Sequence, residues 1–273
     1  MALELGALGL LCASTGNSAV SVAAYGARVG LPVQCLVADA MPPDKLEPIA
    51  AAGARLRPVA GTYSDAHAEA SVLAARLGWA NLTTTYVNPF MLEGDKTLGF
   101  ELFEQLGRAP DAVVVPVGAG PLLGAVGKAF AELRAAGRWV RSGPRLFAVQ
   151  AAGCAPIARA FREGAPVRAW GRPDTAAGGI ADPLAGYVAD GDRTLAAVRA
   201  SGGAAIAVGD DEMAQAADQL AAGDGVTVEL SAAAAAAGWL RLRDQGRIAA
   251  DDLTVLVLTA ADRRADQPGT SLK

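Results

Sequence analysis

The chain has 273 residues and a formal net charge of −4, with 52% hydrophobic and 19% charged residues. This composition is that of a globular protein and excludes a disordered chain. No basic stripe stands out, so nucleic acid is not an expected partner, and the apolar start of the chain is too short to span a bilayer, so no membrane is expected.

Short apolar runs alternate with amphipathic stretches along the chain. This alternation predicts an α/β fold of parallel sheets covered by helices. We expect strands at residues 8–13, 33–37, 55–59, 82–85, 112–117, 145–150, 204–208 and 254–258. We expect helices at residues 18–29, 43–52, 63–77, 93–106, 122–136, 156–163, 192–201, 212–222 and 231–245. A domain boundary is expected near residues 86–89, which gives domains of residues 1–87 and 88–273.

The cysteines are Cys12, Cys35 and Cys154. Their number is odd and no Cys-x-x-Cys pair occurs, so neither a metal site nor a redox motif is predicted. Buried thiols in a reducing cytoplasm are the natural interpretation.

The sequence Ser14-Thr15-Gly16-Asn17-Ser18 stands between an expected strand and an expected helix. Backbone N–H groups at a helix N-terminus favour an anion, and serine and asparagine side chains add hydrogen bonds. A plain helix cap by Asn17 or Ser18 accounts for the pattern equally well. Taken alone, the motif therefore leaves both an anion site and a simple cap open.

A second motif, Gly118-Ala119-Gly120-Pro121-Leu122, also lies between a buried strand and a helix. Parallel α/β folds bind phosphates at such places, and glycines let backbone N–H groups approach phosphate oxygens. No Gly-Lys-Ser/Thr follows, so it is not a P-loop, and no acidic residue suits a dinucleotide fingerprint. A tight turn between strand and helix is the other interpretation.

Two further patterns carry weaker predictions. Glu93, Lys96 and Thr97 lie within one helical turn and can share a surface, although their spacing favours a solvated helix start with one ion pair. The single histidine, His67, is expected on the surface of a polar-faced helix. No Gly-x-Ser-x-Gly elbow accompanies it, so Ser-His-Asp catalysis is not predicted.

Taken in order, these motifs resemble the pyridoxal-phosphate (PLP) enzymes of the tryptophan-synthase-β-like fold, or fold type II, and within them threonine synthase. The subgroup rests on Asn88-Pro89 with Leu92-Glu93-Gly94-x-Lys96-Thr97, and on Gly61-Thr62-Tyr63-Ser64-Asp65-Ala66. The resemblance covers nearly all of the chain. It implies two parallel-sheet α/β domains: a smaller, mobile one at residues 1–87 and a PLP-binding one at residues 88–273 that lacks its N-terminal strands.

The resemblance also implies roles for individual residues. Asn17 would hydrogen-bond the ring hydroxyl of the cofactor, and Ser14, Thr15, Gly16 and Ser18 would hold a substrate carboxylate. Thr259 would face the pyridine nitrogen and leave it largely unprotonated, which suits elimination and replacement chemistry. The cofactor phosphate would be cradled by Gly118, Ala119, Gly120, Pro121 and Leu122.

Three departures from the family count against catalysis by the chain as printed. The family's Schiff-base lysine lies in a Ser-Phe-Lys-Asp-Arg-like motif before the helix that ends here at Gly6, and this chain begins after it. No catalytic residue is therefore assigned, and a mis-called start, a fragment and a pseudoenzyme all stay open. Pro121 has no N–H to donate, and Thr259 is followed by Ala260 instead of the family's glycine. The lysines present are Lys45, Lys96, Lys128 and Lys273.

The function that the resemblance implies is a lyase that converts O-phosphohomoserine to threonine by γ-elimination and β-addition of water. A serine or threonine dehydratase and a cysteine-synthase-like β-replacement enzyme are the alternatives within the family. A non-catalytic protein of the same fold is the alternative of another class. The expected partners are a small amino-acid substrate and a second copy of the chain, in cytoplasmic amino-acid biosynthesis.

Overall fold

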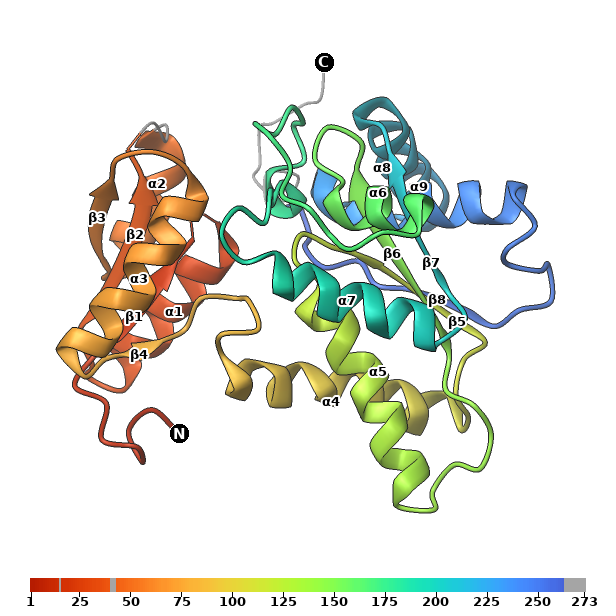
Figure 1. The fold of residues 1–273 in the computed structure, drawn as a ribbon, viewed down its shortest axis with the longest axis horizontal. Coiled ribbons are helices and arrows are strands. Elements are labelled where there is room, and N and C mark those ends of the chain that lie inside the picture. The colour runs from red at the N-terminus through yellow and green to blue at the C-terminus, as the bar shows by residue number, and fades with distance from the viewer. Residues whose placement is uncertain (15, 40–42, 263–273) are drawn as a thin grey trace. The chain divides into compact units, whose positions relative to one another are not determined.

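The structure, a computed structural model, describes residues 1–14, 16–39 and 43–262, without the side chains of residues 43–45. The chain divides into two compact units, Met1–Leu92 and Glu93–Lys273, each with its own four-stranded parallel sheet (Figure 1). The α/β class predicted from the sequence is confirmed, whereas the domain boundary at residues 87/88 stays a prediction. Among the described residues, no helix has both the length and the apolar character needed to cross a membrane.

The sheet of the first unit has the strand order β3-β2-β1-β4. Side chains alternate between its two faces, so that Leu10 and Cys12 pack towards α1 and α2, while Leu11 and Ala13 pack towards α3. The strands are β1 (Leu10–Ala13), β2 (Val33–Ala38), β3 (Arg55–Val59) and β4 (Ala80–Asn81). The helices are α1 (Asn17–Arg28), α2 (Pro43–Ala51) and α3 (Tyr63–Leu77).

The last strand of the first unit differs from the expected strand at residues 82–85. Strand β4 is Ala80–Asn81, and the ladder is continued by a side chain where the strand has ended. The N–H of Ala13 donates to Oγ1 of Thr83 at 3.0 Å, and that hydroxyl donates to Oδ1 of Asn81 at 2.7 Å. Thr83 is fully buried, so this hydroxyl satisfies a backbone donor that the short strand would leave unpaired.

We expect Thr83→Val to destabilise the protein by about 1–3 kcal/mol, the cost of leaving buried polar groups without a partner. Valine keeps the shape of threonine but removes the hydroxyl that Ala13 and Asn81 share. Urea denaturation measures the change, with Thr83→Ser as the control because serine keeps the hydroxyl. A loss of stability for serine with none for valine would show that the methyl group, and not the hydrogen bonds, stabilises this corner.

His67 lies inside the first unit and not on its surface, so its predicted position is wrong. Only 9% of His67 is exposed, and its Nε2 is 3.1 Å from Oγ1 of the buried Thr85. The face of α3 that bears His67 also bears Ala66, Ala70 and Ala74, and it packs on the sheet. The polar residues of α3 therefore led to the wrong prediction that His67 lies on the exposed face of the helix.

The second unit has the strand order β7-β6-β5-β8. Helices α8 and α9 cover one face of its sheet, and α4 to α7 cover the other (Figure 1). The last strand is shorter than the expected 254–258, although the N–H of Val257 still donates to the carbonyl oxygen of Val114. The strands are β5 (Ala112–Pro116), β6 (Arg145–Ala151), β7 (Ala204–Val208) and β8 (Thr254–Leu256). The helices are α4 (Pro89–Leu106), α5 (Pro121–Ala135), α6 (Pro156–Glu163), α7 (Val188–Ala200), α8 (Asp210–Asp224) and α9 (Leu230–Asp244), with a 3-10 turn at Gly178–Ile180.

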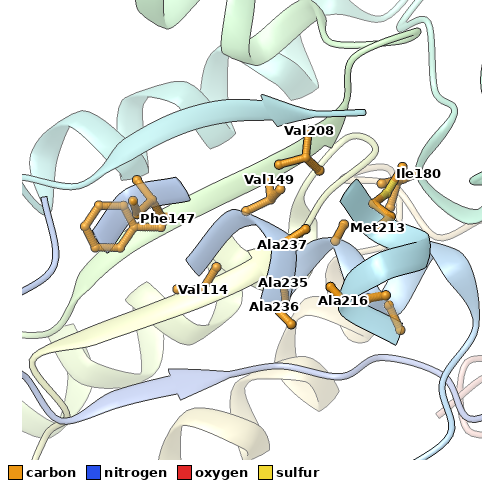
Figure 2. Packing of buried hydrophobic residues seen from close by; sticks show 14 of the residues in the cluster. Val114, Phe147, Val149, Ile180, Val208, Met213, Ala216, Ala235, Ala236 and Ala237 are labelled. Carbon is orange, nitrogen blue, oxygen red and sulfur yellow. The ribbon is translucent and has the colours of Figure 1, made fainter. Parts of the chain in front are cut away.

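Small residues let α9 lie close against the sheet of the second unit. The six alanines at 232–237 are all buried and pack with Val114, Phe147 and Val149 (Figure 2). At Gly238, an added Cβ would come within 2.4 Å of Cγ2 of Val149. The close approach that the alanine run predicts is therefore present, and a larger side chain there would overpack the core.

Candidate functional site

The loop at residues 117–120 connects β5 to α5 at the carboxyl edge of the second sheet. Gly120 is the N-cap of α5 in the left-handed conformation, with φ 89°, and Pro121 is the first helical residue. The first turn of a helix leaves N–H groups without internal acceptors, here those of Leu122 and Leu123. Proline at the first position removes only a group that would not have bonded within the helix. Pro121 is thus compatible with an anion site at this helix end.

Gln150, near the end of β6, connects the loop to α6 through hydrogen bonds of its side chain. Its side chain is fully buried, and its Nε2 donates to the carbonyl oxygen of Gly118 at 3.0 Å. Its Oε1 accepts the N–H groups of Ile157 at 2.8 Å and of Ala158 at 3.0 Å, in the first turn of α6. One side chain therefore satisfies three backbone groups and fixes the loop to its neighbour.

Thr194 of α7 holds the other side of the loop. Its hydroxyl donates to the carbonyl oxygen of Ala119 at 2.6 Å. A Cβ added to Gly120 would lie 2.4 Å from Cγ2 of Thr194, which leaves room at this position for glycine only. The carbonyl oxygens of Gly118 and Ala119 are thus both bonded, to Gln150 and Thr194, and these bonds fix the conformation of the loop.

Asp182 packs directly on the start of the loop. A Cβ added to Gly118 would lie 3.0 Å from Cβ of Asp182. Its Oδ1 accepts the N–H of Leu184 at 3.0 Å and the hydroxyl of Tyr187 at 2.5 Å. Burial raises the pKa of Asp182, and the nearby Asp190 adds to the rise, while the two hydrogen bonds act in the opposite direction.

The N-terminus of α9 and the segment after β8 lie at the same edge of the sheet. Oγ of Ser231 accepts the N–H of Gly179 at 3.0 Å, and the N–H of Glu229 donates to the carbonyl oxygen of Ala260 at 3.0 Å. Thr259, predicted to face the cofactor nitrogen, is exposed and lies three residues beyond the end of β8. The Glu229–Ala260 bond anchors the backbone beside it.

The motif at residues 14–18 belongs to the first unit. Helix α1 begins at Asn17 with Gly16 as its N-cap, and no side chain caps it, so the simple cap is not observed. Oγ of Ser14 accepts the N–H of Gly16 at 3.3 Å. Asn17 is exposed and Ser18 is half-buried, while Thr15 lies outside the described residues. The uncapped end of α1 retains the capacity to bind an anion.

Lys96 is more than part of a solvated helix start, so that interpretation is wrong. Its Nζ lies 2.8 Å from Oε2 of Glu132 on α5 and 2.5 Å from Oε2 of Glu93, and the side chain is only 9% exposed. These hydrogen bonds, first that of Glu132, raise the pKa of Lys96. Lys128 also pairs with Glu93. The cluster ties α4 to α5 and keeps Lys96 protonated.

The geometry of the loop fits a phosphate group. Uncharged N–H donors gather at a helix N-terminus. An added Cβ at Gly120 would collide with Thr194, and one at Gly118 would make a tight contact of 3.0 Å with Asp182. Sequence reasoning missed Gln150, Asp182 and Thr194, which shape the loop. In the sequence, Gln150 is a single polar residue after the apolar run of β6, and this position could have indicated its role.

A parallel α/β fold with a glycine loop and a helix N-terminus at its carboxyl edge is an arrangement that enzymes with phosphate-bearing cofactors use. The family described as "Pyridoxal-phosphate dependent enzyme" matches residues 2–260, and the chain belongs to this family. Its cofactor is PLP, as the resemblance implied.

Three relatives, all named threonine synthase, are similar over almost the whole chain. The protein of Methanosarcina acetivorans is 36% identical over 94% of this chain, that of Methanocaldococcus jannaschii 36% over 97%, and that of Mycobacterium bovis 34% over 100%. The chain spans 63%, 67% and 72% of the lengths of these relatives, respectively.

Solved structures of the same fold cover nearly all of the chain. The processed form of threonine deaminase isoform 2 from Solanum lycopersicum has a TM-score of 0.76 at 23% identity, over 96% of this chain and 68% of its own. A fungal L-serine ammonia-lyase from Rhizomucor miehei has a TM-score of 0.77 at 20% identity, over 96% and 80%. These likenesses confirm the predicted PLP fold of type II.

Proposed function

We propose that the protein is a threonine-synthase-like PLP enzyme that acts on O-phosphohomoserine by γ-elimination and β-addition of water. The observation that carries the proposal is the 36% identity to a protein named threonine synthase over 94% of the chain. The loop at Gly118–Leu122, with its helix N-terminus, supports it with a place for the cofactor phosphate.

The proposed roles of the residues follow from their chemistry. When bound, the cofactor withdraws electrons from the amino-acid substrate. In the second unit, the N–H groups of Gly118–Leu122, other than Pro121, would hold its phosphate, and the hydroxyl of Thr259 would be a partner for its pyridine nitrogen. In the first unit, Asn17 would donate to its ring hydroxyl. The N-terminus of α1 with its preceding loop holds the substrate carboxylate through Ser14, Thr15, Gly16 and Ser18.

We further propose that the 273 residues hold the cofactor without a covalent bond and are inactive by themselves. Lys96 and Lys128, the lysines whose side chains the structure describes, are bound to Glu93 and Glu132. A protonated, ion-paired amine is a poor nucleophile. After addition of PLP and reduction with borohydride, peptide mapping by mass spectrometry should show no adduct on either lysine. An adduct on Lys96 or Lys128 would contradict the proposal.

The substrate proposal is tested by binding to the PLP-loaded chain. O-phosphohomoserine is expected to bind about tenfold or more tightly than homoserine, because its phosphate adds charge-assisted hydrogen bonds. Calorimetric titration with O-phosphohomoserine, homoserine and serine measures the difference. Equal affinities would contradict the proposal, and a preference for serine would favour a dehydratase or a β-replacement enzyme.

A cytoplasmic homodimer is the assembly that we propose. The three cysteines are free and buried, which is consistent with a reducing compartment. Light scattering of the purified chain measures the assembly, and a monomer at all concentrations would contradict it.

A further inference from the structure

Asp182 places a carboxyl group on the wall of the loop that, by the proposed function, holds a phosphate. It contacts Gly118, the first glycine of the loop, whose added Cβ would lie 3.8 Å from its Oδ2. Oδ1 is occupied by the N–H of Leu184 and the hydroxyl of Tyr187. Oδ2 has no hydrogen-bond partner among the residues that the structure describes, so its bonding capacity is free.

An ionised carboxylate beside a phosphate would be repelled by it, because two like charges a few ångströms apart disfavour each other. No cation in the described part of the chain forms an ion pair with Asp182 that could offset this repulsion. A protonated carboxyl has the opposite effect, since its O–H is a donor that a phosphate oxygen can accept.

We propose that Asp182 carries a proton on Oδ2 when the loop binds a phosphate, and that it donates this proton in a hydrogen bond to a phosphate oxygen. The inference rests on the proposed cofactor site and adds to it a carboxyl donor beside the backbone N–H groups. Binding of the phosphate is then coupled to the uptake of one proton by the protein.

The groups that face Asp182 are consistent with this assignment. Burial, with a smaller effect of Asp182, raises the pKa of Cys154 to about 12, so its thiol is neutral. Asp190 is acidic and favours the protonated form of Asp182, whereas Tyr187 and the N–H of Leu184 favour the ionised form. Because burial is the largest of these effects, the pKa of Asp182 is raised.

The test uses pyridoxine 5′-phosphate, which carries the ring and the phosphate but no aldehyde, so lysines do not react with it. Its affinity for the wild-type chain and for Asp182→Asn is measured by calorimetry from about pH 5 to about pH 9. Asparagine keeps a donor at all pH values. Because ionisation of the ligand phosphate affects both dissociation constants equally, their ratio at each pH reports only the difference between aspartate and asparagine.

The affinities are expected to be similar below the raised pKa of Asp182, and the wild type should bind about tenfold more weakly above it, where Asp182 has lost its proton. Titrations in buffers of different ionisation enthalpy should show about one proton more taken up by the wild type where Asp182 ionises. Asp218→Asn, on the exposed face of α8, is the control for the change in net charge and should behave as the wild type.

Two results would overturn the inference about Asp182 and leave the proposed cofactor site intact. A ratio that is constant across the pH range would show that Asp182 does not titrate with binding, and equal proton uptake would show that it does not keep the proton. Absence of binding by the wild type at every pH would overturn the proposed cofactor site and this inference together. Unphosphorylated pyridoxine should show no such pH-dependent ratio, because the donor acts on the phosphate.

Discussion

Replacing Gly120 by alanine is expected to lower the affinity for pyridoxine 5′-phosphate by about thirtyfold or more. With φ 89°, the residue is in the left-handed region, which costs a non-glycine residue about 1–2 kcal/mol. The new Cβ would also lie 2.4 Å from Cγ2 and 2.7 Å from Oγ1 of Thr194. Any movement of Thr194 breaks its bond to Ala119, so the loop must leave the shape that presents its N–H groups. Strain and overpacking together reach about 2 kcal/mol or more, which is thirtyfold in affinity.

Gly137→Ala is the matched control for this change. Gly137 follows the other end of α5 with φ 69°, and an added Cβ there meets no atom within 4 Å. The backbone strain is therefore similar, but no neighbour is displaced. Urea denaturation should show lower stability for both variants, and calorimetry should show weaker binding for Gly120→Ala alone. If both variants lost affinity equally, strain in α5 and not the shape of the loop would control binding.

Most of the fold could be predicted from local patterns because strand and helix periods are properties of short segments. The alanine run of α9 is an example, since small side chains on one helix already imply a close approach to the sheet. Two of the failures are at residues 82–85 and at His67. In both cases a buried hydroxyl, of Thr83 or Thr85, forms a hydrogen bond that the sequence pattern cannot reveal.

The glycine loop could be found from the sequence, but what shapes it could not. Gly118–Leu122 are contiguous and lie at a recognisable junction of strand and helix. Gln150, Asp182 and Thr194 are 28 or more residues away along the chain. The register of the parallel sheet brings Gln150 to the loop, α7 brings Thr194, and the segment before α7 brings Asp182. Lys96 shows the same limit, because its second carboxylate, Glu132, comes from another helix.

Gln150→Leu is expected to lower the free energy of unfolding by about 3 kcal/mol or more. Leucine has a similar size but can bond none of the three buried backbone groups that Gln150 satisfies, and each such group costs about 1–3 kcal/mol when unpaired. These groups are the carbonyl oxygen of Gly118 and the N–H groups of Ile157 and Ala158. The loss should be visible in urea denaturation and should be accompanied by weaker binding of pyridoxine 5′-phosphate.

Gln150→Glu separates the two functions of this side chain. Its carboxylate still accepts from Ile157 and Ala158 at the N-terminus of α6, where a negative charge is favourable, so most of the stability should remain. At a pH above the pKa of the new carboxyl group, it no longer donates to Gly118 and brings a negative charge next to the loop, so the affinity for phosphate should fall further than with leucine. A glutamate variant that binds as tightly as the wild type would show that the bond to Gly118 does not shape the loop. Gln150 would then stabilise α6 alone, and the loop would owe its shape to Thr194 and Asp182.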